Sequence, residues 1–230
     1  MRDPRFFRMF DYSRGLLPNS EIARLEALSP DLATARTHTG ATLGWPGWSL
    51  LYSLVLCHHP RNEPSVIIET GSNFGATTAI LAQALLDLGC GDSRVVTFEI
   101  DEECAERARS LWTRAGVADM IHLVTGDVRE VFEDSLRQFL DERQCRFALL
   151  DASHLEADVK YEFETIRPFL ADDAVVVFDN TYQIAEIGED QRVNGFLRSL
   201  ETNSKGNLVN LPFCSWYTPG IAIWQSDPNL

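Results

Sequence analysis

The 230-residue sequence predicts an α/β protein with a doubly wound, seven-stranded sheet that is mostly parallel and ends in an antiparallel hairpin. Two observations predict this fold. Short β-branched runs alternate with helical segments between residues 65 and 180, which is typical of a parallel sheet covered on both faces. Two further runs near the end of the chain follow each other without an intervening helix. We expect these two to pair antiparallel at one sheet edge.

The five runs expected as parallel strands are short and strongly apolar. They cover residues 66–68, 94–98, 121–124, 146–150 and 174–178. Helices are expected after the successive strands, over residues 77–88, 102–115, 128–140, 155–169 and 191–200. The last two strands, 208–211 and 221–224, are separated by a turn-prone segment that contains Pro219 and Gly220.

The region before the first strand has a different pattern. We expect residues 1–45 to form a helical extension or lid, and residues 46–230 to form the main domain. A helix is expected over residues 21–28, with Ser20 as its cap and Pro30 beyond its end. Residues 37–48 are rich in glycine, threonine and proline and are expected to be a loop, whereas the apolar run 48–56 predicts a buried helix.

Composition excludes several classes of partner. The formal net charge of −14 and the pI near 4.7 disfavour nucleic acids and anionic membrane surfaces. The sequence contains neither an apolar run of about 20 residues nor a secretory signal pattern. Its five scattered cysteines form no C-x-x-C pair, so a reduced, cytoplasmic protein is expected. A small molecule is the expected partner, and a homodimer stays open.

Ligands of open parallel sheets bind at the carboxyl ends of the strands. The first strand is followed by a glycine-containing turn whose candidate cofactor-binding residues are Glu69, Gly71, Asn73, Gly75 and Thr77. The turn does not match the dinucleotide fingerprint G-x-G-x-x-G. Glu99 ends the second strand, where a carboxylate can accept hydrogen bonds from ribose hydroxyls. Asp127 follows the third strand and is either an adenine acceptor or a helix cap.

Oxygen-bearing side chains follow the fourth and fifth strands. Asp151 and His154 follow the fourth strand, and Asp179 and Asn180 follow the fifth. Two carboxylates and an amide suit a hard divalent cation such as Mg²⁺ rather than zinc. The alternative is that Asp and Asn occur there because they favour turns.

These motifs together resemble the class I S-adenosylmethionine-dependent methyltransferases, which have a Rossmann-like fold. In particular, they resemble the metal-dependent O-methyltransferases of the catechol and caffeoyl-CoA type, over roughly residues 48–224. In those enzymes the aspartate after the fourth strand is a metal ligand, and a lysine three residues later is the general base. Here Asp151 keeps the ligand place and also contributes to the cofactor site, whereas His154 occupies the place of the base. Sugar O-methyltransferases of the macrocin type, which the sequence also resembles, use histidine in that role.

The resemblance implies S-adenosylmethionine as cofactor, with methyl transfer to a small-molecule hydroxyl that His154 deprotonates with help from Mg²⁺ or another hard divalent cation. Two other functions remain open: an iron-dependent enzyme resembling cephalosporin hydroxylases, and a cofactor-binding protein without turnover. Two weaker features also have two interpretations. Trp45, Trp48 and Trp216 either wall an acceptor pocket or pack in the core, and residues 182–194 form either a flap or a solvated acidic loop.

Overall fold

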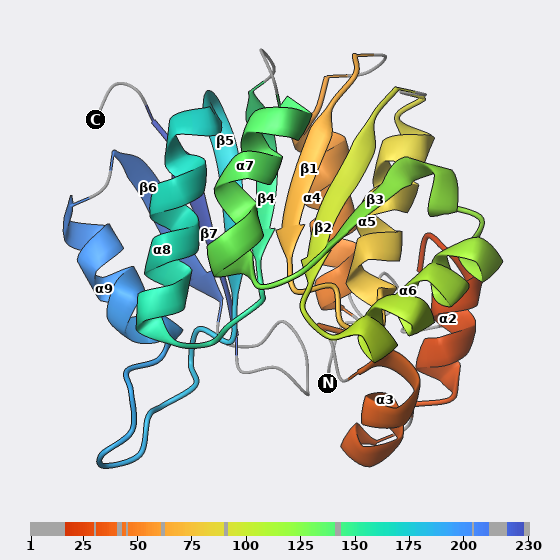
Figure 1. The fold of residues 1–230 in the computed structure, drawn as a ribbon, viewed down its shortest axis with the longest axis horizontal. Helices are drawn as coiled ribbons and strands as arrows, with labels where there is room; N and C mark the ends of the chain where they lie inside the picture. The colour runs from red at the N-terminus through yellow and green to blue at the C-terminus, as the bar shows by residue number, and fades with distance from the viewer. Residues whose placement is uncertain are drawn as a thin grey trace, which may run out of the picture.

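The computed structural model describes residues 17–29, 31–40, 43–44, 46–60, 63–89, 92–140, 144–203, 205–211 and 220–227. Its seven strands form one sheet in the order β3-β2-β1-β4-β5-β7-β6 (Figure 1). The parallel strands are β1 (Val66–Thr70), β2 (Arg94–Glu99), β3 (Ile121–Thr125), β4 (Cys145–Leu150) and β5 (Leu170–Asp179). Strand β7 (Ile221–Ser226) runs antiparallel between β5 and β6 (Gly206–Leu211). The predicted fold class is therefore confirmed.

The strand order reverses between β1 and β4. From β1 the chain builds outward through β2 to β3, and it then returns to place β4 on the other side of β1. A crevice opens at such a switch point, outside the carboxyl ends of the strands, because the connections leave in opposite directions. These ends lie along the lower edge of the sheet in Figure 1.

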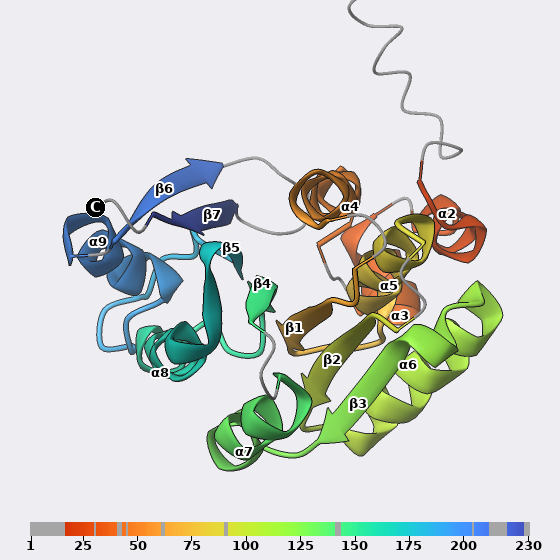
Figure 2. The same cartoon turned by 90° about the horizontal axis from the view of Figure 1, so that it is seen from above.

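Helices cover both faces of the sheet (Figure 2). One face carries α4 (Gly47–His58), α5 (Ala76–Asp87) and α6 (Glu102–Ala115), and the other carries α7 (Val128–Leu140), α8 (Glu156–Ile166) and α9 (Val193–Asn203). Alternation along β1 supplies both layers: Ile67 packs in the cluster with Trp48 and Leu81, whereas Ile68 packs with Phe132 and Phe163. The 3-10 helices η2 (Ala118–Met120) and η3 (Arg167–Phe169) lead into β3 and β5.

Two short helices, α2 (Ser20–Ala27) and α3 (Leu32–Thr39), precede the main domain. The cap of α2 is Asn19 and not Ser20 as predicted, because the Asn19 side chain accepts hydrogen bonds from the backbone N–H groups of residues 21 and 22. The loop expected over residues 37–48 is wrong at both ends. Residues 37–39 belong to α3, which Gly40 caps in a left-handed conformation, and residues 47–48 belong to α4. Ile22 and Leu25 belong to the same hydrophobic cluster as α5. No helix in the described ranges is long and apolar enough to cross a membrane.

Candidate active site

A cavity of about 510 Å³ opens at the carboxyl ends of the strands. The structure brings most of the predicted site residues to its wall. These are Gly71, Asn73, Glu99, Asp127, Asp151, His154, Asp179 and Asn180. They come from the ends of the five parallel strands or from the turns that follow, so the fold gathers residues that are up to 109 positions apart (71 to 180) around one space.

Three predicted cofactor-binding residues are not among those that line the cavity. The Glu69 carboxylate lies inside the protein and accepts hydrogen bonds from Thr78 (2.5 Å) and Thr97 (2.7 Å). The Thr77 hydroxyl accepts a hydrogen bond from the Trp48 ring nitrogen at 3.1 Å, and Gly75 caps α5. In the structure these residues attach the turn to the neighbouring elements, because Glu69 Oε2, the Thr77 hydroxyl and the Gly75 carbonyl accept hydrogen bonds within the protein.

Gly71 lets two strand ends approach each other closely. Its φ of 78° lies in the left-handed region, and a Cβ atom there would overlap with the backbone of Asp151 and Ala152. The amide of Asp151 also donates to the Thr70 hydroxyl at 3.1 Å. The turn after β1 and the turn after β4 are therefore in direct contact, and together they form the floor of the cavity.

Glu99 and Asp127 both hold backbone groups while facing the cavity. The two carboxylate oxygens of Glu99 accept from the backbone amides of Asn73 (2.7 Å) and Asp101 (2.9 Å). Each oxygen keeps further acceptor capacity, which suits a pair of ribose hydroxyls. Asp127 accepts from the amide of Arg129 at 2.9 Å and so caps α7, while also lining the cavity. The two expectations for Asp127 are thus compatible.

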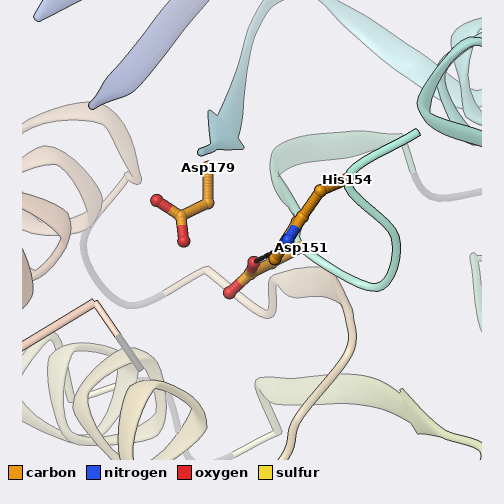
Figure 3. A group of neighbouring side chains, drawn as sticks. All are labelled: Asp151, His154 and Asp179. Carbon is orange, nitrogen blue, oxygen red and sulfur yellow. Dashed lines mark hydrogen bonds and ion pairs between the residues drawn. The ribbon is translucent and has the colours of Figure 1, made fainter. Parts of the chain in front are cut away.

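Asp151, His154 and Asp179 form a cluster at the β4 and β5 end of the cavity (Figure 3). One ligand atom from each lies within 4.8 Å of the others. Burial, reinforced by neighbouring carboxylates, raises the pKa of both Asp151 and Asp179 well above the ordinary value. The Asp179 Oδ1 atom is buried and has no hydrogen-bond partner. Two crowded carboxylates with an unpaired oxygen fit a bound cation, which would allow both to ionise.

His154 lies between an aspartate and an amide. Its Nε2 atom is 3.4 Å from Asp151 Oδ1 and 2.6 Å from Asn180 Nδ2. Nε2 cannot donate to the carboxylate and accept from the amide at once, so the tautomer and the amide orientation are linked. Burial lowers the pKa of His154, and the charge of Asp179 opposes this shift. A neutral imidazole at neutral pH is the form that accepts a proton.

The cavity also contains residues that sequence reasoning missed. Glu162 on α8 lines the cavity at 2% exposure and accepts a hydrogen bond from the Thr70 hydroxyl at 2.6 Å. Burial raises its pKa to about 8. Its position was readable from the helical period, because it lies on the buried stripe that contains Val159, Phe163 and Ile166. Arg36 on α3 also lines the cavity, and no sequence pattern signalled it.

The weaker predictions have mixed outcomes. Trp48 is fully buried in the core, whereas Trp45 and Trp216 lie outside the described residues. The segment after β5 extends beyond the strand ends in Figure 1, and its Ile184 and Ile187 side chains are strongly exposed. Exposed side chains are expected both of a flap and of a solvated acidic loop, so the structure favours neither interpretation of residues 182–194.

Comparison with known proteins identifies the family. Residues 68–181 match a family profile described as a methyltransferase domain. This chain contains a class I methyltransferase domain. The matched segment of the methyltransferase runs from β1 to the turn after β5, and therefore includes all the cavity residues predicted from the strand ends. No curated protein sequence matches it significantly.

Solved structures share the fold of this methyltransferase at low sequence identity. The O-methyltransferase TomG from Streptomyces achromogenes, involved in tomaymycin synthesis and solved with S-adenosylmethionine, is 21% identical with a TM-score of 0.72, and 99% of each chain is covered. An O-methyltransferase from Bacillus cereus, solved with S-adenosylhomocysteine, is 23% identical with a TM-score of 0.70, covering 94% of this chain and 96% of that one. A methyltransferase from Geobacter sulfurreducens is 21% identical with a TM-score of 0.64, covering 99% and 98%.

Proposed function

We propose that this methyltransferase transfers the methyl group to a hydroxyl oxygen of a small molecule, with a hard divalent cation at Asp151, Asp179 and Asn180 and His154 as general base. The observation that carries the proposal is the meeting of Asp151, His154 and Asp179 at one end of the cofactor cavity. The O-methyltransferases of similar fold support the choice of oxygen as acceptor.

The chain's own residues have separable tasks. Glu99 holds the ribose, and the turn at Gly71 lets the cofactor approach the backbone closely. As the acceptor oxygen bonds to the methyl carbon and the carbon–sulfur bond breaks, the hydroxyl proton passes to the unprotonated ring nitrogen of His154. When bound, a cation at the two aspartates lowers the hydroxyl pKa and orients the oxygen. The alignment of the reacting atoms provides much of the remaining rate.

The same cluster supports an iron-dependent oxygenase less well. Such sites use two histidines and one carboxylate, whereas the described cluster offers one histidine and two carboxylates. Metal analysis of the purified protein, together with assays in the presence of added metals, separates the two functions. The proposal expects Mg²⁺ to support activity and expects no dependence of activity on iron.

The decisive test is turnover. Pools of hydroxylated acceptors are incubated with labelled S-adenosylmethionine, with and without Mg²⁺, and methylated product and S-adenosylhomocysteine are quantified. We expect turnover that chelator abolishes and Mg²⁺ restores, and that Asp179→Asn reduces strongly. Turnover that is unaffected by chelator and by Asp179→Asn would rule out metal assistance.

A pH–rate profile tests the base at saturating Mg²⁺. Because burial lowers the pKa of His154, the wild-type rate should rise with pH through a titration below the ordinary range of histidine and then become constant. His154→Gln should keep cofactor affinity and lower turnover by about 10²–10⁴-fold. If the variant keeps the profile and most of the rate, His154 is a metal ligand or a structural residue instead.

A further inference from the structure

Among the described residues of the cavity wall, one arginine has no partner. Arg36, on α3, lines the cavity beside the turn that holds Gly71 and Asn73. Its side chain is exposed, and it forms no hydrogen bond or ion pair with any described residue. An arginine that covers a cavity without an internal partner keeps its donor groups for a ligand.

The rest of the charged wall is mostly acidic. Its described carboxylates belong to Glu99, Asp127, Asp151, Asp158, Glu162 and Asp179. The other guanidinium of the wall, on Arg129, is already held by Asp158 (Nε to Oδ1, 2.8 Å) and lies over the Tyr161 ring. A ligand carboxylate that enters this cavity meets mainly other carboxyl groups, and among the described wall residues only Arg36 has an unpaired guanidinium to pair with it.

A specific contact holds α3 against the turn after β1, which contains Gly71 and Asn73. Asn73 Nδ2 donates to the carbonyl of Gly40, the C-terminal cap of α3, at 3.3 Å. Gly40 has a φ of 73°, and a Cβ atom there would overlap with the Asn73 side chain. The backbone amide of Asn73 donates at the same time to Glu99. One residue therefore connects the ribose-binding acid to the helix that carries Arg36.

We infer that Arg36 binds the carboxylate at the methionine end of the cofactor, and that the Asn73–Gly40 contact positions α3 for this. S-adenosylmethionine carries an ammonium, a sulfonium and a single carboxylate, so the acidic wall suits its two cations and Arg36 suits its one anion. The same cavity is lined by Gly71 and Asn73 of the turn after β1, and by Gly40, which Asn73 contacts at the end of α3. The inference rests on cofactor binding, and it gives the segment before residue 45 a role in completing the site.

The test compares two ligands on matched variants of the full chain. Calorimetry measures the affinity for S-adenosylhomocysteine and for its decarboxylated analogue, which keeps the adenosine, the thioether and the ammonium group. Arg36→Gln should weaken S-adenosylhomocysteine binding by about tenfold, the scale for losing a charge-assisted hydrogen bond, and should leave the analogue unchanged. Arg36→Lys should restore part of the affinity. Arg137→Gln, which removes the same charge from an exposed position on α7, should change neither affinity.

Asn73→Gly tests the positioning contact, because glycine keeps the left-handed backbone and the amide to Glu99 but removes the side-chain amide. It should weaken S-adenosylhomocysteine binding by about threefold, and its effect should be less than multiplicative with Arg36→Gln. Equal weakening of both ligands by Arg36→Gln would overturn the inference. So would unchanged cofactor affinity with a raised acceptor KM, which would assign Arg36 to an acceptor anion. Both results leave the proposed O-methylation intact, whereas wild type that binds no S-adenosylhomocysteine would overturn both.

Discussion

Glu162→Gln is a test of how burial at the cavity affects stability. Glu162 is 2% exposed, and burial raises its pKa from 4.5 to about 8, although the hydrogen bond from Thr70 opposes the shift. Glutamine keeps the size of the side chain and an oxygen that accepts from Thr70, but it does not ionise. The variant therefore removes the titration with little change in packing.

The magnitude follows from proton linkage. Between pH 5 and pH 8 the unfolded chain has largely lost the Glu162 proton, whereas the folded protein largely retains it. The folded state binds more protons in this window, so wild-type stability falls as pH rises. At about 1.4 kcal/mol for each tenfold change in proton concentration, the loss across the window is about 3 kcal/mol relative to Glu162→Gln.

Urea unfolding at several pH values, with chelator present and no cofactor, measures this difference. The free energy of unfolding of Glu162→Gln relative to wild type should rise by about 3 kcal/mol from pH 5 to pH 8. The control is Glu164→Gln on the same helix, where the side chain is 61% exposed and pairs with Lys160. The free energy of unfolding of this control should change with pH in parallel with that of wild type. If the free energy of unfolding of Glu162→Gln also changes with pH in parallel with that of wild type, the buried carboxyl titrates normally and the reasoning is refuted.

Three further changes test other parts of the site. Glu99→Ala should weaken S-adenosylhomocysteine binding by about 1–3 kcal/mol in calorimetry, and unchanged affinity would exclude it from the ribose site. Thr97→Val should destabilise the fold by about 1–3 kcal/mol in urea, because the buried Glu69 carboxylate loses a donor; wild-type stability would contradict this. Gly71→Ala should lower both stability and turnover, because its Cβ atom would displace the backbone of Asp151. Full activity in Gly71→Ala would show that the two turns can separate.

The sequence by itself determined the fold class and eight of the residues that line the cavity. Alternating strands and helices usually form a parallel sheet covered on both faces. This architecture places the carboxyl ends of all the parallel strands at the same edge of the sheet. Residues such as Glu99, Asp151 and Asp179 could therefore be assigned to one site before any contact was known. The direction of each side chain did not follow from the sequence. Glu69 in β1 and Thr77 in α5 flank the turn that contains Gly71, and yet their side chains form hydrogen bonds in the protein interior.

Only the tertiary structure decided which distant groups share that space. Arg36 and Glu162 belong to helices whose local sequence carries no ligand motif, and the packing of α3 and α8 against the strand ends brings them to the cavity. The crowding of Asp151 with Asp179, and the contact of His154 with Asn180, also depend on the strand register between β4 and β5. Local periodicity specifies which face of an element is buried, but pKa values and ligand sets depend on distances of a few ångströms between elements, and these are fixed by packing.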